Sequence, residues 1–337
     1  MAPPPDPVLH GGDLAAATAR FGAPAEGWLD LSTGINPLPY PLPDLPDEAW
    51  TRLPQHDREA ALIAAARDCY GVAPEAAVVA APGTQAIVQW LPRLAPPRRV
   101  VVHGPTYGEH AAAWSDAGHA VTTVEAPGDA PPHEVAVFVS PNNPDGRVWP
   151  REALLAAAER CAGAGGFAVI DEAFADLVPD ASLATQAAAP GLVILRSVGK
   201  FFGLAGLRVG FALGRHALLA PLRRAIGPWA VSGAALEIAG TALKDEAWMA
   251  QTRSRLSTLR SRLDAILEAA GLTVVGGTDL FRLAGSAEAA RLHAHLGAHG
   301  ILTRAFDHDD GVLRFGLPGD DADFARLERA LALMERR

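Results

Sequence analysis

The sequence predicts an α/β fold in which a mainly parallel sheet lies between helices. Between residues 55 and 200, short apolar runs alternate with helix-like stretches, as expected for strands that are buried on both faces of a parallel sheet. Glycine and polar residues follow several of these runs, at the strand ends where such sheets bind ligands. Beyond about residue 230 the pattern changes, which predicts a smaller α+β domain.

The expected elements of the larger domain follow in order along the chain. We expect a helix over 58–70, a strand over 78–81, a helix after Pro82-Gly83, a strand over 100–102 and a helix after Tyr107. Further strands are expected over 135–139, 167–170 and 192–195, with a helix over 151–162. The smaller domain is expected to contain a long helical region to about residue 270, strands near 274, 281, 302 and 313, and helices from about 287 and 321.

These patterns divide the chain into three segments. Residues 1–50 are rich in proline and glycine and show little periodicity, residues 51–230 form the large domain, and residues 231–337 form the small domain. A length of 337 residues suits about two domains.

Composition excludes several classes of protein. Acidic residues outnumber basic ones by 38 to 29, for a formal charge of −9, so we expect neither nucleic acid nor an anionic membrane as the main partner. Two cysteines exclude a disulfide framework and a four-cysteine metal site, and we expect no metal. The N-terminus has neither a basic start nor an apolar core, and no apolar run could span a bilayer. We therefore expect a cytoplasmic protein.

Lysine is unusually scarce in this chain. Of the 29 basic residues only Lys200 and Lys244 are lysines. Lys200 follows an apolar strand among glycine and apolar residues, where loss of hydration would free its amine for a Schiff base; alternatively, its head reaches solvent from an apolar stem. Lys244 lies in a polar helical stretch and reads as a surface charge.

Other residues at the strand ends have two interpretations each. Asp171 could pair with a protonated ring nitrogen or cap a helix. The turn of Gly83, Thr84 and Gln85 could hold a phosphate or simply start a helix. Ser197 and Arg208 could bind the same phosphate; alternatively, Ser197 is a turn residue and Arg208 forms a structural ion pair. Tyr107 could stack on an aromatic ring or be a core aromatic. Asn143 could donate to a ring oxygen or be a turn residue.

The order of these residues is more specific than any one of them. A phosphate turn, an aromatic residue, Asn143-Pro144, Asp171 and then Ser-x-x-Lys with an arginine eight positions later resemble the fold-type I pyridoxal-phosphate enzymes, in particular the class I/II aminotransferase family. The resemblance covers residues 83–210 and extends to Arg314. It implies a seven-stranded, mainly parallel sheet in a cofactor-binding large domain, a first segment that covers the active site, and a homodimer.

The resemblance also implies a role for each matching residue. Lys200 would hold pyridoxal 5'-phosphate as a Schiff base and move the proton at Cα, and Asp171 would keep the pyridine nitrogen protonated. Asn143 would contact the ring oxygen, and Tyr107 would stack on the ring. The residues expected to bind the cofactor phosphate are Gly83, Thr84, Gln85, Ser197 and Arg208. Arg314 would bind the carboxylate of the substrate.

Two positions depart from the family pattern. Phe174 stands where the family commonly has a tyrosine, so that the ring oxygen loses a phenol donor. Leu53 precedes Pro54 where a tyrosine often reaches the phosphate of the partner subunit. A contact between subunits at that position is therefore absent or replaced.

The N-terminal segment narrows the family. His10-Gly11-Gly12-Asp13 and the later stretch from Leu31 to Pro37 resemble the threonine-phosphate decarboxylase branch of cobalamin biosynthesis. This branch decarboxylates L-threonine O-3-phosphate to (R)-1-amino-2-propanol O-2-phosphate, and histidinol-phosphate aminotransferases are the alternative. Either substrate is a small phosphorylated amino compound, whose phosphate we expect His10, Asn36 and Arg304 to bind. Each of these three can also be read as a terminal, turn or surface residue.

Overall fold

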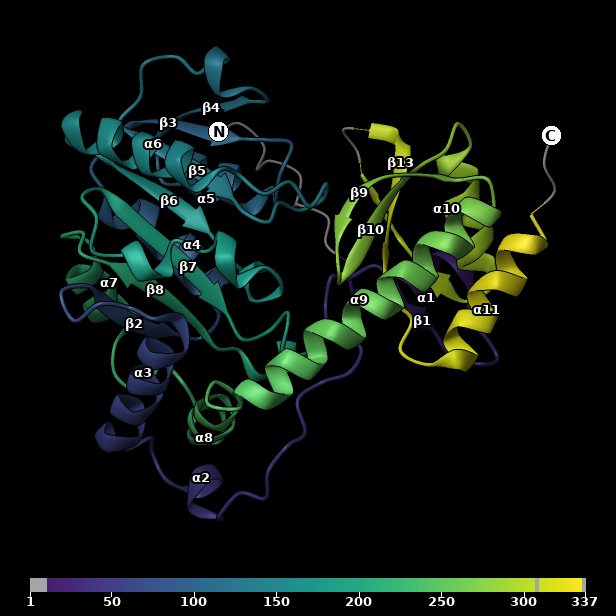
Figure 1. The fold of residues 1–337 in the computed structure, drawn as a ribbon, viewed down its shortest axis with the longest axis horizontal. Helices are drawn as coiled ribbons and strands as arrows, with labels where there is room; N and C mark the ends of the chain where they lie inside the picture. The colour runs from purple at the N-terminus through teal and green to yellow at the C-terminus, as the bar shows by residue number, and fades with distance from the viewer. Residues whose placement is uncertain (1–10, 307–308, 335–337) are drawn as a thin grey trace. The chain divides into compact units, whose positions relative to one another are not determined.

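The chain folds into two compact units in the computed structural model, which describes residues 11–306 and 309–334 (Figure 1). One unit is formed by residues 39–251, and the other combines residues up to Leu38 with residues from Thr252 onward. Helix α8 (Gly233–Ala242) packs against α2 and α3 of the first unit, which therefore continues past residue 230. The three segments predicted from the sequence stay a prediction about domains.

The first unit contains a central sheet flanked by helices. Its other helices are α2 (Glu48–Thr51), α3 (His56–Tyr70), α4 (Thr84–Leu94), α5 (Glu109–Asp116), α6 (Arg151–Gly163), α7 (Leu219–Ile226) and the start of α9 (Glu246–Ala269). Its strands are β2 (Ala77–Ala81), β3 (Arg99–His103), β4 (Ala120–Val124), β5 (Val135–Val139), β6 (Phe167–Asp171), β7 (Leu192–Ser197) and β8 (Gly210–Gly214).

The predicted sheet is confirmed as seven-stranded and mainly parallel within residues 39–251. Its order is β2-β8-β7-β6-β5-β3-β4, and only β8 runs antiparallel to its neighbours. The first residue of β8, Gly210, pairs with Ala81 at the end of β2 and with Ser197 at the end of β7. The carboxyl ends of the parallel strands and the start of β8 therefore lie along one edge.

Apolar burial explains why these sequences form strands. All five residues of β5 and of β6 are buried, which matches the continuous apolar runs in the sequence. Alternate strand residues share one core with helices α4, α5 and α7, and α6 packs against β5, β6 and β7 (Figure 1). Since successive strand residues face opposite sides, each strand end presents one residue to each layer.

The second unit is built on a four-stranded antiparallel sheet. Its order among the described residues is β12 (Arg304–Phe306), β13 (Asp309–Gly316), β10 (Phe281–Gly285) and β9 (Thr273–Thr278). Beside it, β1 (Leu29–Asp30) pairs in parallel with β11 (Ile301–Leu302). The helices are α1 (Leu14–Phe21), α10 (Ala289–Ala298), α11 (Asp321–Ala332) and the remainder of α9. The predicted smaller α+β domain is thus confirmed in its class.

The expected long helical region after residue 230 is interrupted. It consists of α8 and α9, and the carboxylate of Asp245 accepts a hydrogen bond from the Trp248 backbone N–H at 2.9 Å. This side chain caps the start of α9 and satisfies a donor that the new helix would otherwise leave open.

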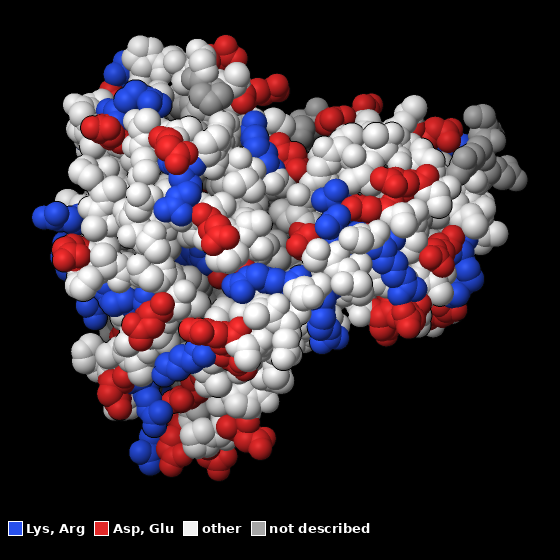
Figure 2. Space-filling model, viewed as in Figure 1, with Lys and Arg blue, Asp and Glu red and all other residues white. Residues whose placement is uncertain are grey.

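The surface carries both charges. On the face drawn in Figure 2, acidic and basic side chains lie intermixed over the helices of the first unit, consistent with the modest excess of acidic residues. Within the described residues, no helix combines the length and the apolar character needed to cross a bilayer.

Candidate active site

The structure brings the predicted residues of the large domain to one edge of the sheet. Gly83 follows β2, Tyr107 follows β3, Asn143 follows β5, and Ser197 ends β7. Arg208 lies two residues before β8, whose first residue pairs with the ends of β2 and β7. All of them lie within residues 39–251, as do Thr84, Gln85, Asp171 and Lys200.

The turn before α4 forms a close-packed cradle with Arg208. Gly83 has a φ of +83°, and a Cβ at this position would lie 2.7 Å from the Nη2 atom of Arg208. A Cβ on Gly210 would lie 2.5 Å from the Thr84 backbone nitrogen. Arg208 itself has a left-handed backbone with φ of 56°. The guanidinium therefore lies against backbone at the N-terminus of an 11-residue helix, an arrangement suited to a phosphate.

Asp171 is a buried carboxylate held by two donors. Its Oδ2 atom lies 2.9 Å from Nε2 of the buried His110, and its Oδ1 atom accepts a hydrogen bond from the Ala173 N–H at 3.0 Å. Strand β6 is paired on both sides, with Asp171 opposite Val139 and Leu195. The carboxylate is therefore fixed in position at the strand edge, as a partner for a ring nitrogen requires.

Tyr107 and Gln85 are linked by their side chains. The Tyr107 hydroxyl donates to Oε1 of Gln85 at 3.1 Å, and Nε2 of Gln85 donates to Oε2 of Glu109 at 2.5 Å. Burial raises the pKa of Tyr107 well above its ordinary value, as do the negative charges of Glu109 and Asp171, against the positive charge of Arg208. The phenol is therefore neutral, and the side chain of Gln85 is engaged while its backbone lies in the first turn of α4.

Lys200 lies three residues beyond the end of β7. It is half-buried, and its Nζ atom lies 5.9 Å from the centre of the Phe174 ring. Phe174 itself follows Asp171 by three residues, so that Lys200 and Asp171 extend from neighbouring parallel strands toward the same edge. The amine of Lys200 therefore lies at the strand edge that also bears Asp171.

The two adjacent asparagines have different surroundings. Asn142 is fully buried, accepts from the Thr106 hydroxyl at 2.6 Å and donates to Asp145 at 2.8 Å and to the Pro105 carbonyl at 3.0 Å. Asn143 is half-buried at the edge of the sheet. Asn142 thus holds the turn together, and Asn143 follows it at the strand edge.

Comparison with known proteins identifies the family. Residues 42–327 match the family described as aminotransferase class I and II. The chain belongs to this family. Threonine-phosphate decarboxylases of Sinorhizobium sp and Pseudomonas aeruginosa are each 45% identical to it, over 98% and 96% of this chain and 99% and 96% of their own lengths.

Solved structures of class I and II aminotransferase relatives confirm the fold. A histidinol-phosphate aminotransferase from Sinorhizobium meliloti in complex with pyridoxal-5'-phosphate has a TM-score of 0.76 at 19% identity, covering 96% of this chain and 94% of that one. An L-threonine-O-3-phosphate decarboxylase from Porphyromonas gingivalis has a TM-score of 0.73 at 20% identity, covering 90% and 98%. At these identities the likeness speaks for the fold alone.

Pyridoxal 5'-phosphate is the cofactor of the class I and II aminotransferases, and the strand edge fits it. The glycine cradle under Arg208 suits its phosphate, because any larger residue at position 83 would fill the space beside the guanidinium. The buried carboxylate of Asp171 suits a protonated pyridine nitrogen. Lys200, at the same edge, would supply the amine that the cofactor aldehyde requires.

The predicted substrate ligands lie in the other unit. Arg314 on β13 is the cross-strand partner of Arg304 on β12. Arg314 is buried, donates to the Ser32 carbonyl at 2.5 Å, and has a pKa lowered to about 10, first by burial and then by the charge of Arg304. The amide oxygen of Asn36 accepts from the Leu38 N–H at 2.8 Å, as in a turn. His10 falls outside the described residues.

The glycines of the N-terminal motif have a structural reason within the second unit. A Cβ on Gly11 would lie 2.3 Å from the Ser32 carbonyl oxygen, and the Gly12 N–H donates to the Ser32 hydroxyl at 2.7 Å. The same Ser32 carbonyl accepts from Arg314. The Gly-Gly step therefore packs directly on the backbone that holds Arg314.

Some residues around the candidate site were not predicted from the sequence. Glu109 and His110 lie two and three residues after Tyr107; Glu109 contacts Gln85 at the start of α4, and His110 contacts Asp171 at the end of β6. A buried ion cluster was also missed, in which Arg196 contacts Glu172 at 3.0 Å and also Asp176. The one feature of the sequence that could have indicated them is their position, because they lie within five residues of Tyr107, Asp171 or Ser197.

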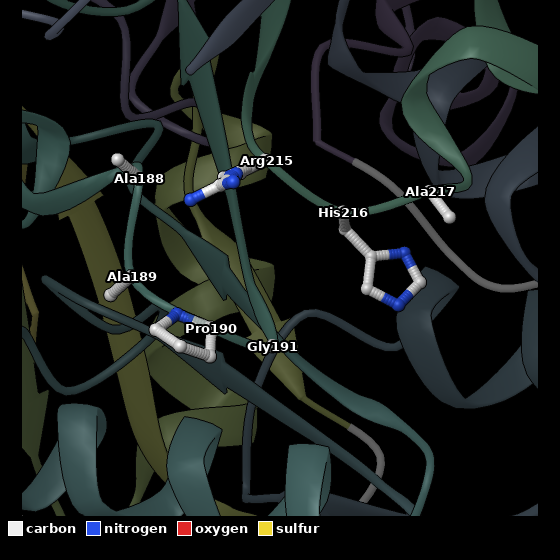
Figure 3. A pocket seen from close by; sticks show the side chains of 7 residues that line it. All are labelled: Ala188, Ala189, Pro190, Gly191, Arg215, His216 and Ala217. Carbon is white, nitrogen blue, oxygen red and sulfur yellow. The ribbon is translucent and has the colours of Figure 1, made fainter. Parts of the chain in front are cut away.

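A pocket of about 320 Å³ lies at the opposite edge of the sheet. Residues 188–191, before β7, and 215–217, after β8, line it (Figure 3). The side chains of Arg215 and His216 diverge in this view, and burial lowers the pKa of His216. Because polar groups do not converge here, the pocket is not the candidate site.

Proposed function

We propose that this chain catalyses the decarboxylation of L-threonine O-3-phosphate to (R)-1-amino-2-propanol O-2-phosphate, a lyase reaction of cobalamin biosynthesis. The observation that carries the proposal is the 45% identity, over nearly the whole chain, to two curated threonine-phosphate decarboxylases. By comparison, a histidinol-phosphate aminotransferase of Burkholderia mallei is 35% identical over 58% of the chain. The aminotransferase reaction is therefore the alternative.

The residues at the strand edge have complementary tasks in this reaction. The turn of Gly83, Thr84 and Gln85, with Ser197 and Arg208, binds the cofactor phosphate. The bound cofactor supplies an electron sink for the carbon next to the amine. Asp171 holds positive charge at the ring nitrogen and so keeps that sink effective, while Asn143 binds the ring oxygen and Tyr107 covers the ring. His110 orients Asp171 through their 2.9 Å contact.

Lys200 has two successive tasks. Its amine would first hold the cofactor through the cofactor aldehyde. The bond between Cα and the carboxylate then breaks, carbon dioxide leaves, and Lys200 delivers a proton to Cα. Arg314 binds the substrate carboxylate, and Asn36, Arg304 and His10 bind its phosphate. Binding of that remote phosphate orients the substrate, so that its binding energy favours the decarboxylation geometry.

We further propose a cytoplasmic homodimer. Family membership supports the dimer, and the two free cysteines, Cys69 and Cys161, suit a reducing compartment. Leu53, at the position of the family tyrosine, has 59% of its surface exposed in the single chain. A leucine there offers a partner subunit an apolar contact instead of a phosphate ligand.

The deciding experiment supplies L-threonine O-3-phosphate alone and measures carbon dioxide. We expect stoichiometric release without a keto acid. Release that depends on a keto acid, or turnover only of histidinol phosphate, would establish the alternative reaction.

The two lysines offer a matched test of the cofactor link. Lys200→Ala should lose the visible absorption of the Schiff base and several orders of magnitude of activity. Lys244→Ala, at an exposed position, should keep both. Borohydride reduction followed by peptide mapping should label Lys200, and a label at Lys244 would contradict the assignment.

A further inference from the structure

Glu109 lies within reach of the phosphate turn without being an expected ligand of the cofactor. Its Oε2 atom accepts from Nε2 of Gln85 at 2.5 Å and from Nε2 of Gln89 at 3.3 Å. The other end of the Gln85 amide, Oε1, accepts from the Tyr107 hydroxyl at 3.1 Å. Three side chains from two helices and a strand-end loop thus form one linear chain of hydrogen bonds.

We propose that Glu109 is a positioning residue that acts through Gln85 to fix the direction of the Tyr107 hydroxyl, and with it the pose of the aromatic ring that covers the cofactor. The inference rests on the proposed function, because it concerns the ring predicted to stack on pyridoxal phosphate.

The direction of the chain follows from elementary donor and acceptor chemistry. An ionised carboxylate only accepts hydrogen bonds, so Glu109 selects the nitrogen end of the Gln85 amide. The oxygen end then faces Tyr107, which must donate its single hydroxyl hydrogen. A neutral residue at position 109 would remove this selection, because an amide can present either end.

The fixed direction constrains the reaction. Once the hydroxyl hydrogen of Tyr107 is directed to Gln85, the phenol oxygen can only accept hydrogen bonds from a ligand. The raised pKa of Tyr107 keeps the hydroxyl from ionising. The Tyr107 hydroxyl is thereby committed to Gln85, and proton delivery to the substrate stays assigned to Lys200.

A second contact holds the same ring from another side. The His110 ring stands edge-on to Tyr107, with centroids 6.0 Å apart and an angle of 86° between the planes. His110 is bound in turn to Asp171. Glu109 and His110 are consecutive residues at the start of α5, where the helix dipole also favours a carboxylate. The first turn of α5 therefore joins the phosphate turn to the strand end that bears Asp171.

The test compares Glu109→Gln with the wild type in the cofactor-loaded protein. We expect the circular dichroism of the visible cofactor band to change, because the covering ring is no longer held in one pose. We also expect kcat to fall about 5- to 20-fold, because the hydrogen bond from Gln85 to a charged acceptor is lost. Glu75→Gln, the same substitution at an exposed residue between α3 and β2, should leave both unchanged.

A double-mutant cycle separates positioning from a general structural role. In a Tyr107→Phe background, which lacks the hydroxyl, Glu109→Gln should have no further effect on the band or on kcat. Gln85→Met, which interrupts the chain while keeping Glu109, should reproduce the effect of Glu109→Gln. Glu109→Asp, which keeps the charge, should restore at least half of the loss.

The measurements separate failure of the proposed role of Glu109 from failure of the proposed function. A wild-type protein that binds pyridoxal phosphate but yields a Glu109→Gln variant with an unaltered band, or effects that add to those of Tyr107→Phe, would refute the role of Glu109 alone. A wild-type protein without any visible band would refute both proposals. If Glu109→Gln fails to fold, Gln85→Met decides the question by the same two measurements.

Discussion

Replacing Arg196 should be among the most damaging single changes in the first unit. Its guanidinium contacts Glu172 at 3.0 Å and also Asp176, and each of these three side chains is at most 3% exposed. Glu172 also accepts from the Ser182 hydroxyl at 2.5 Å and from the Leu183 N–H at 2.7 Å. Arg196→Met would preserve the apolar stem and remove the only charge that compensates two buried carboxylates among these contacts.

The expected magnitude follows from burial. Removing one partner of a buried ion pair costs about 3–5 kcal/mol, because the other charge stays buried and uncompensated. An exposed pair is worth only about 0.2–1 kcal/mol. Arg99 provides the comparison, since it pairs with Glu134 at 2.5 Å while 59% of its side chain is exposed.

The assay is urea unfolding of the cofactor-loaded protein. Arg196→Met should lower the free energy of unfolding by about 4 kcal/mol, whereas Arg99→Met should lower it by less than about 1 kcal/mol. Adding Glu172→Gln and Asp176→Asn to Arg196→Met should recover part of the loss, because neutral amides tolerate burial better than carboxylates. Equal losses for the two arginine variants would refute the reasoning.

Further predictions test the site and the pH response. Gly83→Ala should weaken cofactor binding about tenfold, since its Cβ would lie 2.7 Å from Arg208 on a left-handed backbone; loss of the visible band on dilution measures this, and unchanged retention would contradict the cradle. His110→Phe should lower kcat roughly 10- to 100-fold by removing the partner of Asp171, and an effect below twofold would argue against orientation. Burial, followed by nearby positive charge, lowers the pKa of His103 to about 4. As pH falls, His103 is therefore protonated in the unfolded chain before it is protonated in the folded one, and the free energy of unfolding should drop by about 3 kcal/mol between pH 6.5 and 4. His103→Phe should remove this pH dependence, as measured by urea unfolding at each pH.

The sequence predicted the fold where burial leaves a local signature. The fully buried strands β5, β6 and β7 are continuous apolar runs and were predicted from them. Strand β4 was missed, because most of its residues are partly or fully exposed and its threonines break the run. Strand β8 was missed because it begins and ends with glycine and starts at Gly210, where the Lys200 motif ends.

Site residues, like strands, could be predicted only where the sequence carries a local pattern. Lys200, Asp171 and Arg208 were predicted because a resemblance fixes their order in the chain. Glu109 could not be found in this way, since an acidic residue in the first turn of a helix is ordinary. Its meaning depends on the amide of Gln85, which is 24 residues away in sequence and in hydrogen-bond contact in the fold. His110 is likewise interpretable only once β6 places Asp171 beside it.

The ion cluster has a consequence for the chemistry. Asp171 and Glu172 are consecutive, as are Arg196 and Ser197, and consecutive residues of a strand face opposite sides of a sheet. Asp171 contacts His110 of α5, while Glu172 contacts Arg196 on the neighbouring strand. A slip of one residue would bring Glu172 toward His110 and place Asp171 among the buried charges. The pairing of Arg196 with Glu172 and Asp176 opposes that slip, because only the observed register places the Arg196 guanidinium beside the carboxylates of both Glu172 and Asp176. The cluster therefore secures that Asp171, and not Glu172, faces His110 at the strand edge.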